Sequence, residues 1–140
     1  MVYVTINYWA VLLAGVLSMA LGALWYSPYL FGMTWVKLSK FSTKDLARLK
    51  KSGSVKRSYT IMFLTTLVTG YVLSHFVDYI GAASLLGGVQ LGFWIWLGIA
   101  APLQLGMVLW EGRPVKLYFL ITGHTLANLV LVSAVLAVWP

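Results

Sequence analysis

Long apolar runs separated by short polar segments dominate the pattern of this chain. Four runs approach or exceed the roughly 20 residues that a helix needs to cross a bilayer core, at about residues 7–26, 59–79, 85–110 and 115–139. The start, "MVYVTINYW", lacks the basic segment of a signal peptide, so we expect the first run to be retained as a helix. The pattern predicts an all-α fold, an integral membrane four-helix bundle that forms a single transmembrane domain over residues 1–140.

Basic residues are confined to two connections between these helices. Eight of the ten lie in the loop at about residues 28–57, and the other two, Arg113 and Lys116, lie in the turn between the third and fourth helices. Four spans place both connections on the same side of the membrane. By the positive-inside rule we expect that side to be cytoplasmic, with both termini outside the plasma (inner) membrane.

The basic loop has internal order of its own. Ser27 followed by Pro28 predicts the start of a short helix that lies along the interface, and Ser42 or Thr43 can cap a second short helix, "KDLARLKK". Aromatic residues at the ends of membrane spans anchor a protein at headgroup level. The expected anchors are Trp25, Tyr26, Trp35, Trp110 and Trp139.

The composition supports the membrane class and removes several kinds of chemistry. Hydrophobic residues make up 61% of the chain and charged residues 9%, and the mean hydropathy is +0.88. The sequence has no cysteine, which excludes disulfides, thiolate metal sites, cysteine nucleophiles and palmitoylation.

Four stretches, taken in order, resemble the domain of unknown function 1761 family: "GALWYSPYLFGMTW", "KRSYTIMFLTTLVTGYVLSHFV", "GFWIWLGIAAP" and "EGRPVKLYFLITGHTL". The most specific of them are the "LWYSPYLFG" turn and the "EGRPVKL" linker. The resemblance covers nearly the whole chain, and it implies a small bacterial-type membrane protein with four helices and no assigned activity.

Small residues recur at helical spacing in every predicted span. Because lipid tails are as apolar as the helices, association relies on small residues that let backbones approach. These faces either close the bundle within one protomer or join protomers. The glycines expected to pack helices are Gly22, Gly70, Gly88, Gly92, Gly98, Gly106 and Gly123.

A few polar side chains lie within the predicted spans. His124 lies about 15 Å along its helix from Pro114, near the bilayer midplane, and Asn128 shares its face one turn later. Polar groups at this depth are costly and are functional candidates. Together they define a polar track of His75, Asp78 and Gln90 at the outer mouth, His124 and Asn128 in the middle, and Gln104 and Glu111 toward the cytoplasm.

The spacing of these groups argues against catalysis. The two histidines lie at different depths, so we expect no metal site and no cofactor. Asp78 and Glu111 lie near opposite faces, roughly 30 Å apart, which excludes paired-carboxylate chemistry. The chain has no GxSxG nucleophile motif. We therefore expect no enzymatic activity.

Two functional hypotheses follow. In the first, the protein is an oligomeric channel or a transporter of a small solute or protons along the polar track. In the second, it is a non-catalytic scaffold or accessory subunit that binds lipid or a larger membrane partner, and His124 and Asn128 only bond to neighbouring helices. Under both hypotheses we expect a homo-oligomer whose basic loop faces anionic lipid headgroups. We expect no nucleic acid as a partner, because the orientation of the protein in the membrane accounts for the positive charge of the loop.

Overall fold

The computed structural model of the chain describes residues 3–40 and 43–140, and these residues form helices and no strand. Ser42, expected as a possible cap, lies outside the described residues. The helices, in chain order, are α1 (Tyr8–Trp25), α2 (Gly32–Ser39), α3 (Thr43–Lys51), α4 (Ser54–Tyr79), α5 (Leu85–Ile95), the π-helix η1 (Trp96–Ala100), α6 (Ala101–Gln104), α7 (Gly106–Leu109) and α8 (Val115–Val138).

Four helices are long and apolar enough to cross a membrane, which is the make-up of a multi-pass membrane protein. They are α1, α4, the broken helix at residues 85–109 that comprises α5, η1, α6 and α7, and α8. The helix predicted from about residue 59 begins at Ser54 instead, because Lys56 and Arg57 lower the hydropathy while remaining good helix formers.

Local signals fix where several helices begin. The Asn7 side chain caps α1 by accepting from the backbone N–H groups of Trp9 and Ala10 at 3.1 and 3.2 Å. Ser84 caps α5 by accepting from the Gly87 N–H at 3.0 Å. Pro114 is the N-cap of α8 rather than its first helical residue.

The start of the short helix after α1 was predicted wrongly. Residues 26–31 form a turn, and α2 begins at Gly32. The Ser27 hydroxyl donates back to Leu24 O at 2.6 Å, so it closes the end of α1 and does not open the next helix. A Cβ at Gly32 would lie 2.3 Å from Tyr26 O, so the turn is too tight for any other residue.

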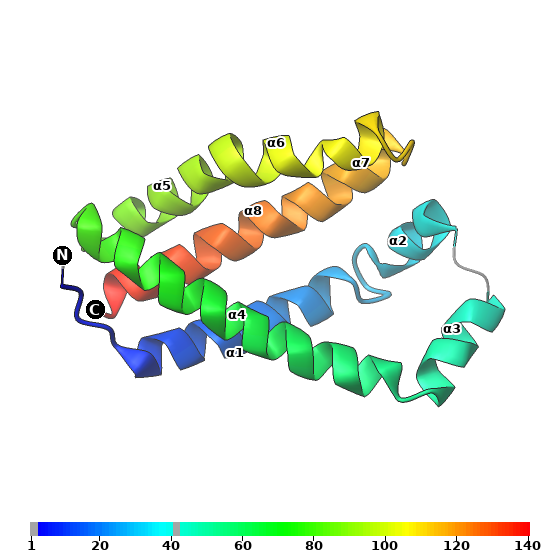
Figure 1. Ribbon diagram of the computed structural model, residues 1–140, viewed down its shortest axis with the longest axis horizontal. Coiled ribbons are helices and arrows are strands. Elements are labelled where there is room, and N and C mark those ends of the chain that lie inside the picture. Colours follow the sequence, from blue (N-terminus) through cyan, green and yellow to red (C-terminus); the bar gives the residue numbers. More distant parts are fainter. Residues whose placement is uncertain (1–2, 41–42) are drawn as a thin grey trace.

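Helix α8 lies at the centre of the molecule (Figure 1). Helix α5 packs along one side of it, while α1 and α4 pack on each other and on its other side. Both termini lie at the same end, where the helices converge, and α4 diverges from α7 and α8 toward the other end. The fully buried apolar cluster lies in the converging half, with Val132 and Ala137 of α8 against Ala10 and Ala14 of α1 and Leu73 of α4.

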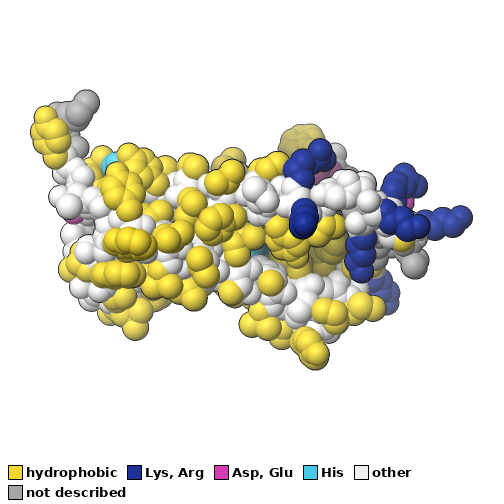
Figure 2. Space-filling model, turned by 90° about the horizontal axis from the view of Figure 1, so that it is seen from below, with side chains coloured by type: hydrophobic (Ala, Val, Ile, Leu, Met, Phe, Trp, Pro, Cys, Tyr) yellow, Lys and Arg dark blue, Asp and Glu magenta, His cyan; other side chains and the backbone are white. Residues whose placement is uncertain are grey.

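We call the two ends of the molecule the termini end and the basic end. Figure 2 shows the Lys and Arg side chains gathered at the basic end, beside a body covered mainly by hydrophobic side chains. The basic residues of α2, α3 and the first turns of α4 are exposed, and so are Arg113 and Lys116 after α7. This separation of charge from apolar surface suits a chain that crosses a bilayer.

Candidate functional site

His124 lies on the side of α8 that faces the end of α1. Its imidazole ring is 5.3 Å from the ring of Tyr26 and 5.9 Å from that of Trp25, between centroids. Gly22 faces this ring, and a Cβ there would make ordinary van der Waals contact with His124 Nε2 at 3.6 Å. That nitrogen is buried and has no hydrogen-bond partner among the described residues. A buried imidazole nitrogen without a partner loses the hydrogen bond it makes in water.

The aromatic residues that follow α1 enclose this histidine. Trp25 packs on Phe31 at 4.8 Å, and Tyr26 packs edge-on against Trp35 at 5.9 Å, between ring centroids. Trp25 was expected to anchor at the interface, but its indole Nε1 donates to Leu120 O of α8 at 3.2 Å. Two aromatic rings and α8 therefore hold the imidazole in place.

Asn128, one turn beyond His124, is bonded to another helix. The Ser18 hydroxyl of α1 donates to Asn128 Oδ1. Ser18 is buried, so this bond ties α1 to α8 inside the molecule. Ser18 is one of the small residues that recur at helical spacing in the first span, but nothing in the sequence identified it as the partner of Asn128.

Gln104 reaches α8 on a different face. Its Nε2 donates to Thr125 Oγ1 at 2.9 Å, and the Thr125 hydroxyl donates its own hydrogen to Ile121 O at 3.1 Å. Because that hydroxyl has one hydrogen, it can only accept from Gln104, which fixes the orientation of the amide. Gln104 Oε1 is consequently a buried acceptor, and it has no partner among the residues that the structure describes.

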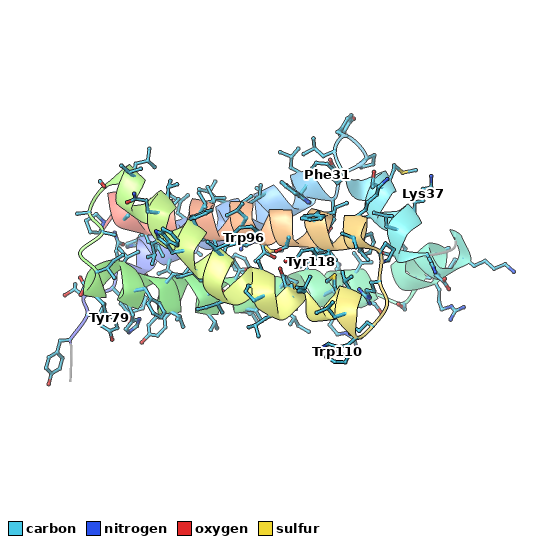
Figure 3. All side chains as sticks on the ribbon, turned by 90° about the horizontal axis from the view of Figure 1, so that it is seen from above. Phe31, Lys37, Tyr79, Trp96, Trp110 and Tyr118 are labelled. Atoms are coloured by element: carbon cyan, nitrogen blue, oxygen red, sulfur yellow. The ribbon has the colours of Figure 1, made fainter. Side chains whose placement is uncertain are left out.

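The third membrane-crossing helix is irregular just before Gln104. The π-helix η1 precedes Pro102, which lacks the N–H that would continue the helical ladder. Side chains hold this break against α8: Trp96 Nε1 donates to Thr122 O at 2.8 Å and to its Oγ1 at 3.0 Å, and the Tyr118 hydroxyl donates to Ala101 O at 2.9 Å. Trp96 and Tyr118 lie at the interface of η1 and α6 with α8 (Figure 3).

The other members of the polar track lie apart from this region. His75 stacks between Tyr71 and Tyr79 on α4, and its Nδ1 donates to Tyr71 O at 2.9 Å. Asp78 borders a small cavity at the termini end. Gln90 and Glu111 are exposed, and Glu111 pairs with Arg113 across 3.6 Å. Among the described residues no hydrogen bond or ion pair joins these groups to His124, so the track is not one connected chain of side chains.

The predicted glycines differ in how closely they approach other helices. A Cβ at Gly88 or Gly92 would lie 2.6 or 2.7 Å from backbone atoms of α8, and a Cβ at Gly70 would lie 3.3 Å from Val11 Cγ1. A Cβ at Gly98 would meet no atom of the described residues within 4 Å. The first group closes the protomer, and Gly98 lies on an outward face. Gly106 and Gly123 face indole rings, those of Trp110 and Trp25, at 3.6 and 3.4 Å.

The chemistry available at these positions is hydrogen bonding. No group of three or more His, Asp or Glu side chains in the described part of the chain is placed to hold a metal ion. Near the middle of α8 two polar atoms, His124 Nε2 and Gln104 Oε1, are buried on neighbouring faces without a hydrogen-bond partner among the described residues. The amide oxygen can only accept, whereas the imidazole nitrogen accepts or donates according to its tautomer, so a small molecule that both donates and accepts hydrogen bonds suits these atoms.

Comparison with known proteins gives a family and no activity. No curated protein and no solved structure matches the chain significantly. The model of the family described as "Protein of unknown function (DUF1761)" matches residues 9–137, which is nearly the whole chain. This protein therefore belongs to the DUF1761 family.

Proposed function

We propose that the protein is a membrane channel or transporter that passes a small hydrogen-bonding solute or protons beside His124. The observation that carries the proposal is the buried His124 Nε2, which has no hydrogen-bond partner among the described residues. An unpaired polar atom in a membrane interior destabilises the protein by between about 1 kcal/mol and several kcal/mol. A solute or water that forms a hydrogen bond with this nitrogen removes that cost.

The surroundings of His124 suit a bound solute better than a structural bond. Gly22 and the Tyr26 and Trp25 rings lie against the imidazole, and none of them hydrogen-bonds to Nε2. The bond from Trp25 Nε1 goes to Leu120 O, so the indole cannot serve the histidine. Gln104 Oε1 offers a second buried oxygen at about the same level, since Gln104 bonds Thr125, the residue after His124; it was expected nearer the cytoplasmic end.

The proposal requires more than one copy of the chain. Gln90 and Glu111 face outward from the single protomer, as do many large apolar side chains of α4, α5 and α8. A pathway that uses these residues needs a neighbouring subunit as its other wall. We propose a homo-oligomer in the plasma membrane, with the basic end in the cytoplasm against anionic headgroups.

Flux measurement tests this function. The purified protein is reconstituted into vesicles, and entry of protons, ammonium, urea and glycerol is followed with an internal pH dye and by light scattering. His124→Leu is compared with Phe119→Leu, which also replaces a ring on α8 but at a position that is 65% exposed. We expect the unmodified protein to pass at least one of these probes. His124→Leu should abolish this flux, and Phe119→Leu should preserve it. Vesicles impermeable to all four probes, or equal flux in both variants, would contradict the proposal.

A second candidate function is a non-catalytic scaffold or accessory subunit, and the Ser18–Asn128 bond favours it. That bond uses Asn128 to join two helices, as expected when polar side chains in a membrane protein serve packing. Under this alternative no probe permeates, and His124→Leu changes only the stability of the protein.

A further inference from the structure

The termini end of the molecule contains a cavity of about 40 Å³. Polar residues on its wall come from the segment before α1, from the last two turns of α4 and from the residues that follow α8. They are Thr5, Asn7, Ser74, Asp78, Trp139 and Pro140. The space exceeds the roughly 10–15 Å³ that one water-sized particle needs.

The groups on this wall whose hydrogen bonds are fixed offer only acceptors to the cavity. Ser74 gives its hydroxyl hydrogen to Gly70 O at 2.9 Å, so its oxygen can only accept. The Asn7 amide nitrogen donates to Pro140 O at 3.2 Å and to Trp139 O at 3.4 Å, and both oxygens keep lone pairs with which to accept. The Asp78 carboxylate is acceptor-only when ionised.

No Lys or Arg side chain of the described residues lies at this end. Asp78 lies in the last turn of α4, where the helix dipole disfavours an anion, and neither α4 nor α8, which also ends here, carries a basic residue in its last turn. All ten Lys and Arg of the sequence fall within residues 37–57 and 113–116, at the basic end. Asp78 has no ion pair with a described residue. The neighbouring His75 uses Nδ1 to bond Tyr71 O.

We propose that this cavity binds a small, hard metal cation, Ca²⁺ or Na⁺, held by the Asp78 carboxylate, the Ser74 hydroxyl and the Trp139 carbonyl. Such cations take oxygen ligands of these kinds, with water completing the shell. One carboxylate among neutral oxygens gives weak binding, at the level of about 10⁻⁴–10⁻³ M for Ca²⁺. The site has a single acidic side chain, so it is not a cluster of acidic residues and histidines. It is independent of the proposed flux through the protein.

Thermal unfolding tests the site. The full chain in a neutral detergent is melted, with tryptophan fluorescence as the signal, in CaCl₂, NaCl or choline chloride at equal ionic strength. We expect Ca²⁺ or Na⁺ to raise the Tm above that in choline, with half-saturation near 0.1–1 mM if the ion is Ca²⁺. Asp78→Asn removes the cation-dependent rise, while Glu111→Gln, the matched change at the basic end, keeps it.

Two results would overturn the proposal. One is a Tm that neither cation changes relative to choline, which leaves water as the occupant of the cavity. The other is the same rise in Asp78→Asn as in the unmodified protein. If Asp78→Asn does not fold, Tb³⁺ replaces the cation in the unmodified chain. Its luminescence, excited through tryptophan, should fall when Trp139 is changed to Phe and when Ca²⁺ is added; unchanged luminescence in both cases contradicts the site.

Discussion

The contact between α5 and α8 at Gly92 gives a prediction whose size follows from the geometry. A Cβ at Gly92 would lie 2.7 Å from Leu129 O and from Val130 Cα and N, whereas ordinary van der Waals contact begins at 3.4 Å. These are backbone atoms of a helix and cannot turn aside, so Gly92→Ala must push α5 away from α8 by roughly 0.7 Å. Overpacking of this kind costs about 1–3 kcal/mol. Because α5 makes its main packing contact with α8, we expect that loss in the free energy of unfolding.

Gly98→Ala is the matched control. It makes the same chemical change in the same membrane-crossing helix, but a Cβ there meets no described atom within 4 Å. Alanine is the better helix former by about 1 kcal/mol, so this variant should be unchanged or slightly more stable. Equilibrium unfolding in mixed micelles of increasing dodecyl sulfate content, followed by circular dichroism, measures both. Equal stabilities for the two variants would refute the claim that Gly92 is a contact and Gly98 an open position.

Three further predictions concern polar contacts and charge. Ser18→Ala should lower the free energy of unfolding by about 0.6–1.7 kcal/mol, and a double-mutant cycle with Asn128→Leu should show coupling; additive effects would contradict the Ser18–Asn128 bond. Trp96→Phe should cost about 0.5–1.5 kcal/mol in the same unfolding assay, since it removes the bonds to Thr122, and a fully stable variant would count against them. Changing the lysines of α3 to glutamine should reduce retention of anionic over zwitterionic lipid in native mass spectra, by about 1 kcal/mol per lysine; unchanged retention would show that α3 does not touch the headgroups.

The sequence predicted the four membrane-crossing helices well, because each is marked by a long apolar run bounded by polar residues. The ends at Trp25, Tyr79, Leu109 and Val138 fall within one residue of the predicted ones. The start of α4 was missed because a helix can form from polar residues as well as apolar ones. The basic segment before the apolar run contains good helix formers, so α4 begins within it. Pro102 interrupts the third membrane-crossing helix, but no feature of the sequence marks the π-helix at Trp96–Ala100 that precedes it.

The direction in which each polar side chain points was less predictable. Helix α8 is apolar on nearly all sides, so its sequence does not say that His124 faces α1 while Thr125 faces Gln104. Trp25 shows the same limit: its place at the end of a span predicted a headgroup anchor, and the fold-back of residues 26–31 turned its ring onto α8. Trp110, 88% exposed beside the basic end, keeps the surroundings of an anchor. Threonines in apolar helices are the signal that would have pointed to the partners of Gln104 and Trp96.

Whether water or a solute reaches His124 can be measured by water-edited solid-state NMR of the protein in lipid bilayers with ¹⁵N-labelled histidine. The two histidines are assigned by comparison with the His124→Leu spectrum, which lacks one of them. We expect the His124 imidazole to receive magnetisation from water or from another mobile molecule, because its Nε2 has no hydrogen-bond partner among the described residues. An imidazole that receives none, and whose nitrogen shifts report a bond to the protein itself, would contradict a solute pathway at His124 and leave the scaffold function in its place.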